Sequence, residues 1–264
     1  MQRFTGRVAF VTGAGHGIGR ATCLRLAAEG GTVVAADIDT SAADETARLV
    51  AEAGGTALAL RCDILDRSSV DAAVETATSR FGRLDALVNA AGGALEEAWS
   101  GRSGDELWAR QLDFNLTGVV RCVQAALPHL AASAGNVVSV GSVNGLAAFG
   151  GESYSAAKAG LTSLTQNLAV THGPAGVRVN LVAPGTVRTR VWDGKDDALA
   201  RLTGLYPLGR VGEPADIAAA IAFLASDDAA WITGIVLPVE GGVLAGIQKA
   251  STPPLPDSPV NRQR

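Results

Sequence analysis

RVAFVTGAGHGIGR, residues 7–20, is the stretch of sequence from which the predicted fold follows. Arg7 to Thr12 is rich in β-branched residues and predicts a strand, whereas Ile18 to Ala28 spaces its apolar residues as a helix does. The glycines between these segments predict a tight turn, and Gly30-Gly31 predict the end of the helix. The chain is therefore expected to begin with a strand, a glycine turn and a helix.

The same alternation continues along the chain. Further strands are predicted at 32–37, 56–61, 86–89, 136–140, 177–182 and 235–239, and further helices at 41–53, 66–80, 105–129, 154–172 and 214–225. Ser41 with Asp44 and also Asp66 are expected helix caps, and Pro214 suits a first helical turn. Most strands are continuous apolar runs, so we expect a parallel sheet of about seven strands with helices on both faces. The predicted class is a doubly wound α/β fold.

Length and composition predict one domain over residues 1–250. The chain has 264 residues, of which 47% are hydrophobic, and a net charge of −4 without a basic block. Nucleic acid and anionic membranes are therefore not expected as partners. The three scattered cysteines predict reduced core thiols in a cytoplasmic protein, and the three scattered histidines predict no metal site. Residues 251–264 hold four of the ten prolines and are expected to form a separate C-terminal tail.

The glycine turn is also a candidate phosphate site. Backbone N–H groups at the start of a helix bind anions, and glycine lets a pyrophosphate approach them. The spacing is not the common G-x-G-x-x-G, because the glycines that fit lie at 13, 17 and 19. Asp37 follows Gly19 by 18 positions, where a carboxylate accepts hydrogen bonds from an adenosine ribose and repels a 2′-phosphate. The pair predicts NAD rather than NADP; a flexible loop and a turn-initiating aspartate are the alternatives.

A second candidate site is the pair Tyr154 and Lys158. Residues four apart share one face of a helix, so the phenol and the ammonium are expected to lie side by side. A neighbouring cation stabilises a phenolate and lowers its pKa, which would make Tyr154 a general acid/base. The alternative is a half-buried aromatic residue beside a solvated lysine.

Several motifs occur in one order along residues 5–246. They are the glycine turn Thr12–Gly19, Asn89-Ala-Ala-Gly92, Asn115, Ser142, Tyr154-x-x-x-Lys158 and Pro184-Gly185. With this set the sequence resembles the short-chain dehydrogenase/reductase family, which implies a Rossmann-type fold. The resemblance also implies hydride transfer between NAD(H) and a secondary alcohol or ketone.

The resemblance assigns a role to each catalytic candidate. Tyr154 is the implied acid/base, and Lys158 lowers its pKa and holds the nicotinamide ribose. Ser142 positions the substrate oxygen, and Asn115 keeps a helix open around a proton-relay water. Ser139 is a rival for the serine, although Gly141-Ser142 aligns better with the paired serines of the family.

The resemblance also implies a set of cofactor contacts. The set contains Tyr154 and Lys158 together with Gly13, Gly15, His16, Gly17, Ile18, Gly19, Asp37, Asp63, Asn89, Ala90, Gly92, Pro184, Gly185, Val187 and Thr189. Asp63 would meet the adenine, and capping of the following turn is its alternative. Asn89 matches a strand-stabilising asparagine.

The substrate is expected to contact the loops 93–104, 144–153 and 190–208. Leu146, Phe149, Trp192 and Leu205 predict a partly apolar pocket, and Arg190 or Lys195 could meet an anion. Two alternatives to an NAD-dependent dehydrogenase stay open: an NADPH-dependent 3-oxoacyl ketoreductase, and a catalytically idle dinucleotide-binding protein. The family resemblance implies a homotetramer or a homodimer built on the helices 105–129 and 154–172.

Overall fold

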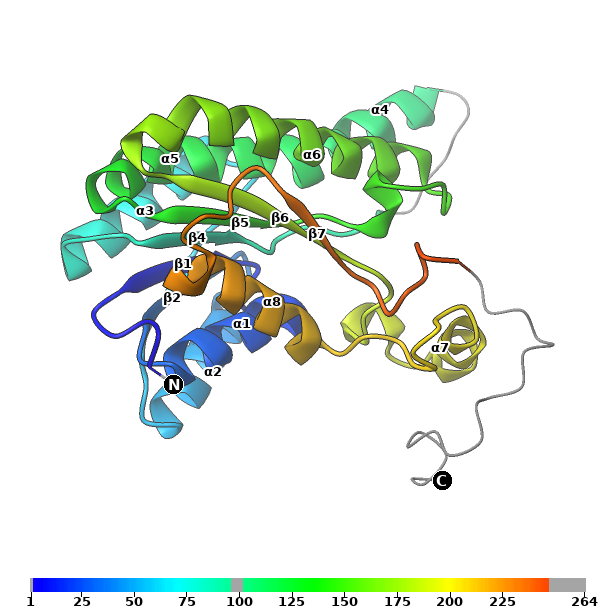
Figure 1. Ribbon diagram of the computed structural model, residues 1–264, viewed down its shortest axis with the longest axis horizontal. Helices are drawn as coiled ribbons and strands as arrows, with labels where there is room; N and C mark the ends of the chain where they lie inside the picture. Colours follow the sequence, from blue (N-terminus) through cyan, green and yellow to red (C-terminus); the bar gives the residue numbers. More distant parts are fainter. Residues whose placement is uncertain (1, 96–101, 247–264) are drawn as a thin grey trace.

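A seven-stranded parallel sheet forms the centre of the protein (Figure 1). The computed structural model describes residues 2–95 and 102–246. Its strands are β1 (Val8–Thr12), β2 (Thr32–Asp37), β3 (Thr56–Arg61), β4 (Ala86–Asn89), β5 (Asn136–Val140), β6 (Arg178–Pro184) and β7 (Val236–Val239). Their order is β3-β2-β1-β4-β5-β6-β7. The chain thus builds outward from β1, returns to its other side at β4, and leaves a crevice where the order reverses.

Helices cover both faces of the sheet (Figure 1). One layer holds α1 (Gly17–Ala28), α2 (Thr40–Glu52) and α8 (Pro214–Ala225). The other holds α3 (Arg67–Phe81), α4 (Arg102–Leu112), α5 (Gly118–Ser133) and α6 (Glu152–His172). The short helix α7 (Asp196–Thr203) lies beside the sheet, past the carboxyl ends of its strands. The predicted doubly wound α/β fold is confirmed.

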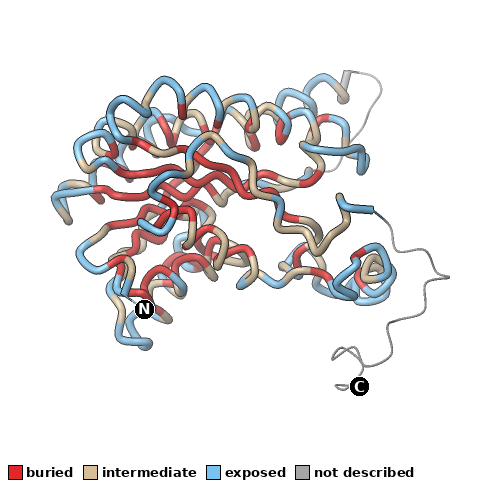
Figure 2. The backbone as a smooth tube through the Cα atoms, in the orientation of Figure 1, coloured by how far each residue is buried: buried red, intermediate tan, exposed pale blue. Residues whose placement is uncertain are grey.

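Strand β1 shows why the sheet needs two layers of helices. Val8 and Phe10 belong to the core on the side of α3, α5 and α6. Ala9 and Val11 belong to the core on the side of α1 and α8. Successive side chains of a strand point to opposite faces, so an unbroken apolar run has to be covered twice. In Figure 2 the five inner strands are accordingly buried, the edge strands β3 and β7 are only partly buried, and the outer surfaces of the helices are exposed.

The structure corrects the sequence prediction at three places. The helix expected at 105–129 is α4, a π-helical turn at Asp113–Thr117, and α5. Helix α2 is capped by Asp39, whose side chain accepts a hydrogen bond from the Ala42 N–H, and not by Ser41. Helix α7 was not predicted, although Asp196 and Asp197 in its first turn are a helix-start signal.

The structure bears on one further expectation and leaves another untested. Cys23, Cys62 and Cys122 are buried free thiols. The predicted tail at 251–264 lies outside the described residues. Among the described residues, no helix is both long and apolar enough to cross a bilayer.

Candidate active site

A cleft of about 820 Å³ lies at the carboxyl ends of the strands. Residues that follow β1, β2, β3, β4, β5 and β6 all contribute to its walls, as does the segment around α7. Most of the predicted cofactor contacts line it: Gly13, His16, Gly17, Ile18, Gly19, Asp37, Asp63, Ala90, Gly92, Tyr154, Lys158, Pro184, Gly185, Val187 and Thr189. Gly15, Asn89 and Asn115 are buried and do not line the cleft. Parallel strands bring these distant segments together because their carboxyl ends share one edge.

The glycine turn has no room for side chains. A Cβ on Gly13 would lie 2.8 Å from the Ala91 Cα, and one on Gly19 would lie 2.1 Å from the Gly13 carbonyl oxygen. Helix α1 starts at Gly17, and its N-cap residue His16 makes no side-chain capping hydrogen bond. The first N–H groups of a helix have no acceptor within the helix. In α1 the residues that carry them, Gly17 to Gly19, line the cleft. This arrangement fits the pyrophosphate of a dinucleotide.

Asp37 is held in place at the end of β2. The Gly15 N–H donates to its Oδ2 at 2.8 Å, and the Asp39 N–H donates to its Oδ1 at 3.0 Å. Each carboxylate oxygen can accept a further hydrogen bond, so the group can still bind a diol. Gly15 supports this geometry, because a Cβ there would lie 2.9 Å from the Asp37 Oδ2.

The structure shows one of the two roles that the sequence left open for Asp63. Its Oδ1 accepts a hydrogen bond from the Leu65 N–H at 3.0 Å, so the side chain does cap the following turn. It also lines the cleft, one strand away from Asp37. The capping role is present, and an adenine contact is compatible with it.

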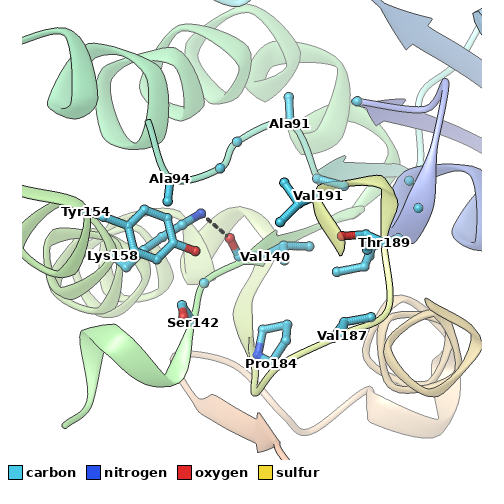
Figure 3. Close-up of a pocket in the computed structure, with 18 of the residues that line it drawn as sticks. Ala91, Ala94, Val140, Ser142, Tyr154, Lys158, Pro184, Val187, Thr189 and Val191 are labelled. Atoms are coloured by element: carbon cyan, nitrogen blue, oxygen red, sulfur yellow. Dashed lines mark hydrogen bonds between the residues drawn. The ribbon is translucent and has the colours of Figure 1, made fainter. Parts of the chain in front are cut away.

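Ser142, Tyr154 and Lys158 come together at the other end of the cleft (Figure 3). Ser142 follows β5, and the other two lie in the first two turns of α6. Figure 3 shows the Tyr154 phenol and the Ser142 side chain on the same side of the cleft. The Lys158 Nζ donates to the Val140 carbonyl oxygen at 2.9 Å and lies 5.6 Å from the Tyr154 ring centroid. The rival Ser139 is buried in β5, accepts a hydrogen bond from Asn89 Nδ2 and is not part of the cleft lining.

Burial is the main cause of the pKa shifts of Tyr154 and Lys158. Burial raises the pKa of Tyr154, and the nearby Ser142 hydroxyl only partly opposes this rise. Burial lowers the pKa of Lys158 to about 8. The sequence predicted that Lys158 lowers the pKa of Tyr154. In the structure burial raises that pKa, and Ser142 is the group that opposes the rise. Lys158 still carries its charge at pH 7, because 7 is below its pKa.

Asn115 lies in the π-helical turn and is completely buried. Its Oδ1 accepts a hydrogen bond from the Gly93 N–H at 2.9 Å, and its Nδ2 donates to the Gly93 carbonyl oxygen at 2.9 Å. Nδ2 also donates to the Gln111 carbonyl oxygen at 3.2 Å. The side chain thus ties the widened helix to the segment that follows β4. Asn89 also links two elements, because its Nδ2 in β4 donates to the Ser139 hydroxyl in β5. Its Oδ1 is buried and has no hydrogen-bond partner.

The wall of the cleft beyond Tyr154 is mostly apolar. It includes Phe149, Trp192, Leu202, Leu205 and Val243. Leu146 and Lys195, which the sequence suggested as substrate contacts, do not line it. Tyr206 lines it and was missed: its hydroxyl oxygen accepts a hydrogen bond from the Thr186 N–H at 2.7 Å. The only signal for it in the sequence is that Tyr206 is the second of two tyrosines.

These features define a doubly wound α/β protein with its cleft where such folds bind nucleotides. A family model described as "Enoyl-(Acyl carrier protein) reductase" matches residues 13–244. The chain is 43% identical to cis-4-hydroxycyclohexanecarboxylate dehydrogenase of Sinomonas cyclohexanicum, over 92% of this chain and 99% of that one. It is 38% identical to meso-2,3-butanediol dehydrogenase of Serratia marcescens, over 92% and 96% of the two chains.

A solved structure shares the fold as well. The crystal structure of a short-chain type dehydrogenase/reductase from Mycobacterium marinum matches with a TM-score of 0.86 and 30% identity, over 92% of this chain and 97% of that one. The chain belongs to the short-chain dehydrogenase/reductase family. It is an oxidoreductase that acts on alcohol groups with a nicotinamide dinucleotide.

Proposed function

We propose that the protein is an NAD-dependent dehydrogenase of secondary alcohols in which Tyr154 is the general acid/base. The observation that carries this proposal is the position of Tyr154 beside Ser142 and Lys158 in the lining of the cleft. Bound NAD would accept the hydride that leaves the carbinol carbon. The remaining chemistry belongs to the side chains of this chain.

In the proposed reaction Tyr154 removes the hydroxyl proton of the alcohol. Ser142 donates a hydrogen bond to the substrate oxygen and so stabilises its developing charge. Lys158 keeps a positive charge 5.6 Å from the Tyr154 ring, where it favours the phenolate. Asn115 positions the segment around Gly93 and belongs to the proposed proton path. Ketone reduction uses the same groups in reverse.

The proposed cofactor site uses the rest of the predicted set. The amides at the start of α1 bind the pyrophosphate, and Asp37 accepts hydrogen bonds from the adenosine ribose. The ordered carboxylate favours NAD, because it would repel the 2′-phosphate of NADP. This argument also opposes the NADPH-dependent 3-oxoacyl ketoreductase. The idle alternative is opposed by the presence of Ser142, Tyr154 and Lys158 together in the cleft.

The proposed substrate has an apolar body around its carbinol carbon. Phe149, Trp192 and Leu205 contribute apolar side chains to the lining of the cleft. Two relatives are named as dehydrogenases of cis-4-hydroxycyclohexanecarboxylate and of meso-2,3-butanediol. Alicyclic and short aliphatic secondary alcohols are therefore the first substrates to test.

We also propose a single domain over residues 1–250, a homotetramer or homodimer, and a cytoplasmic location. Helices α5 and α6, which the family resemblance implies as the interface, form the outer layer on one face of the sheet (Figure 1). Light scattering coupled to gel filtration measures the assembly directly.

The test of the proposed function is the variant Tyr154→Phe. It removes the proton-transfer group and leaves the aromatic ring, so kcat for alcohol oxidation should fall at least about 100-fold. The dissociation constant for NADH, measured by fluorescence, should change little. Near-normal turnover by this variant would exclude Tyr154 as the acid/base. Binding of NADH by the wild type without turnover of any alcohol or ketone would favour the idle alternative.

A further inference from the structure

The segment at residues 188–211, which we name the covering segment, contacts the glycine turn across the cleft. The Arg190 Nη1 lies 2.8 Å from the His16 Nε2. The Thr189 Cγ2 lies 3.1 Å from the place that a Cβ on Gly17 would occupy. Figure 3 shows Thr189 and Val191 on the opposite side of the cleft from Tyr154. The covering segment therefore meets the glycine turn at the start of helix α1.

The contact fixes the protonation of His16. A guanidinium has only donors, so the His16 Nε2 has to accept and the ring has to be neutral. Burial lowers the pKa of His16, and the nearby Arg190 and Arg20 lower it further, against Asp37 and Asp39. A neutral His16 can hold the Arg190 guanidinium without competing with it for an anion.

Arg190 differs from the other cations near this place. Among the described residues it has no carboxylate partner, whereas Arg188 in the same segment pairs with Glu213 at 3.3 Å and with Asp196 at 3.8 Å. Arg20 donates to the Thr46 hydroxyl at 3.0 Å and does not line the cleft. The described cleft lining thus holds two cations, Arg190 beside the glycine turn and Lys158 beside Tyr154.

We propose that Arg190 binds the pyrophosphate of the dinucleotide from the side opposite the α1 amides, and that His16 holds its guanidinium in position. The inference rests on the proposed dinucleotide site. A pyrophosphate brings two negative charges to a helix end whose dipole supplies about half a positive charge, so a further cation there strengthens binding. A guanidinium is suited to this role because it donates two parallel hydrogen bonds to phosphate oxygens. His16 directly precedes the uncapped amides, so a group bonded to it lies next to them.

The test compares ligands with and without a pyrophosphate. Dissociation constants of NADH, ADP-ribose and adenosine are measured by calorimetry for the wild type, Arg190→Gln and Arg190→Lys. Arg190→Gln should weaken NADH and ADP-ribose by about tenfold or more, as expected for a lost charge-assisted hydrogen bond, and adenosine by less than about twofold. Arg190→Lys should bind ADP-ribose with intermediate strength, because it keeps the charge and loses the paired geometry.

Arg188→Gln is the matched control. It removes the same charge from an exposed arginine of the same segment, whose ion pairs are worth little, so ADP-ribose should bind as to the wild type. Equal weakening of adenosine and ADP-ribose by Arg190→Gln would mean a structural role and would overturn the inference. So would unchanged ADP-ribose binding, with or without a raised KM for an anionic substrate. A wild type that binds neither NADH nor NADPH would overturn the proposed function as well.

Discussion

At the residue scale, Lys158 is the group whose position is unfavourable for stability. Its side chain is 4% exposed, and the hydrogen bond to the Val140 carbonyl oxygen replaces only part of its hydration. Burial lowers its pKa from 10.5 to about 8. A buried cation that packing alone would not select is typical of a site in which function has overridden stability.

The shifted pKa of Lys158 predicts a pH dependence of unfolding. Between about pH 8 and pH 10.5 the unfolded chain keeps the proton on Lys158, whereas the folded chain has lost it. The unfolded state then binds more protons, so this lysine makes the free energy of unfolding rise with pH across that window. In Lys158→Met this contribution is absent, and activity is lost with the ammonium.

The measurement is urea denaturation of both proteins at intervals from pH 7.5 to pH 10.5. Subtracting the two free energies of unfolding cancels groups that titrate alike in both, including the cysteines. We expect the wild type to gain stability relative to Lys158→Met as the pH rises. A difference that is constant with pH would contradict a depressed pKa at Lys158.

At the element scale, Gly145 sets the distance between the turn after β5 and helix α6. A Cβ there would lie 2.7 Å from the Lys158 carbonyl carbon and 2.8 Å from the Ala159 nitrogen. Gly145→Ala should therefore push the turn, with Ser142 at its start, away from Tyr154. A displacement of about 1 Å in a catalytic group can cost up to about 100-fold in rate, so we expect kcat to fall at least tenfold.

Gly173→Ala serves as the control for Gly145→Ala. Gly173 has helical backbone angles with φ −54°, and a Cβ there would meet nothing within 4 Å. It should keep normal kcat and NADH binding. Steady-state kinetics of both variants, with thermal unfolding to check the fold, measures the effect. Normal kcat in Gly145→Ala would show that the turn shifts without moving Ser142.

The elements that the sequence predicted well are those with a clear apolar pattern. All seven strands and the helix Pro214–Ala225 appear where the continuous apolar runs and the proline indicate them. The predicted helix 105–129 failed in its middle, because hydrophobic spacing does not register a π-helical turn. The buried hydrogen bonds of Asn115 to Gly93 and Gln111 accompany that turn, and they involve residues that the pattern does not connect.

At the scale of the whole molecule, the topology explains how much of the site was predictable. Residues that follow the parallel strands, such as Gly13, Asp37 and Ser142, share an edge of the sheet whatever the details of packing. The covering segment has no such constraint. Its place depends on a small apolar cluster of Leu199, Tyr206 and Val211, so the contact of Arg190 with His16 could not be derived from spacing.

The proposed preference for NAD can be measured on the whole fold, because a ligand that binds only the folded state stabilises it. NADH at 100 times its dissociation constant should add about 2.7 kcal/mol to the free energy of unfolding. For a chain of this size that raises Tm by roughly 5–10 °C. NADPH at the same concentration should raise it much less, because its 2′-phosphate would meet the carboxylate of Asp37.

Asp37→Ala tests this cofactor preference directly. Without the carboxylate, the Tm shift given by NADH should shrink and that given by NADPH should grow, each measured against the variant alone. The kcat/KM ratio for NAD over NADP should fall in parallel. Asp71→Ala is the matched control, because it removes the same charge from an exposed helix position that does not line the cleft. If Asp37→Ala and Asp71→Ala gave the same pair of Tm shifts, net charge rather than the ordered carboxylate at the end of β2 would set the preference.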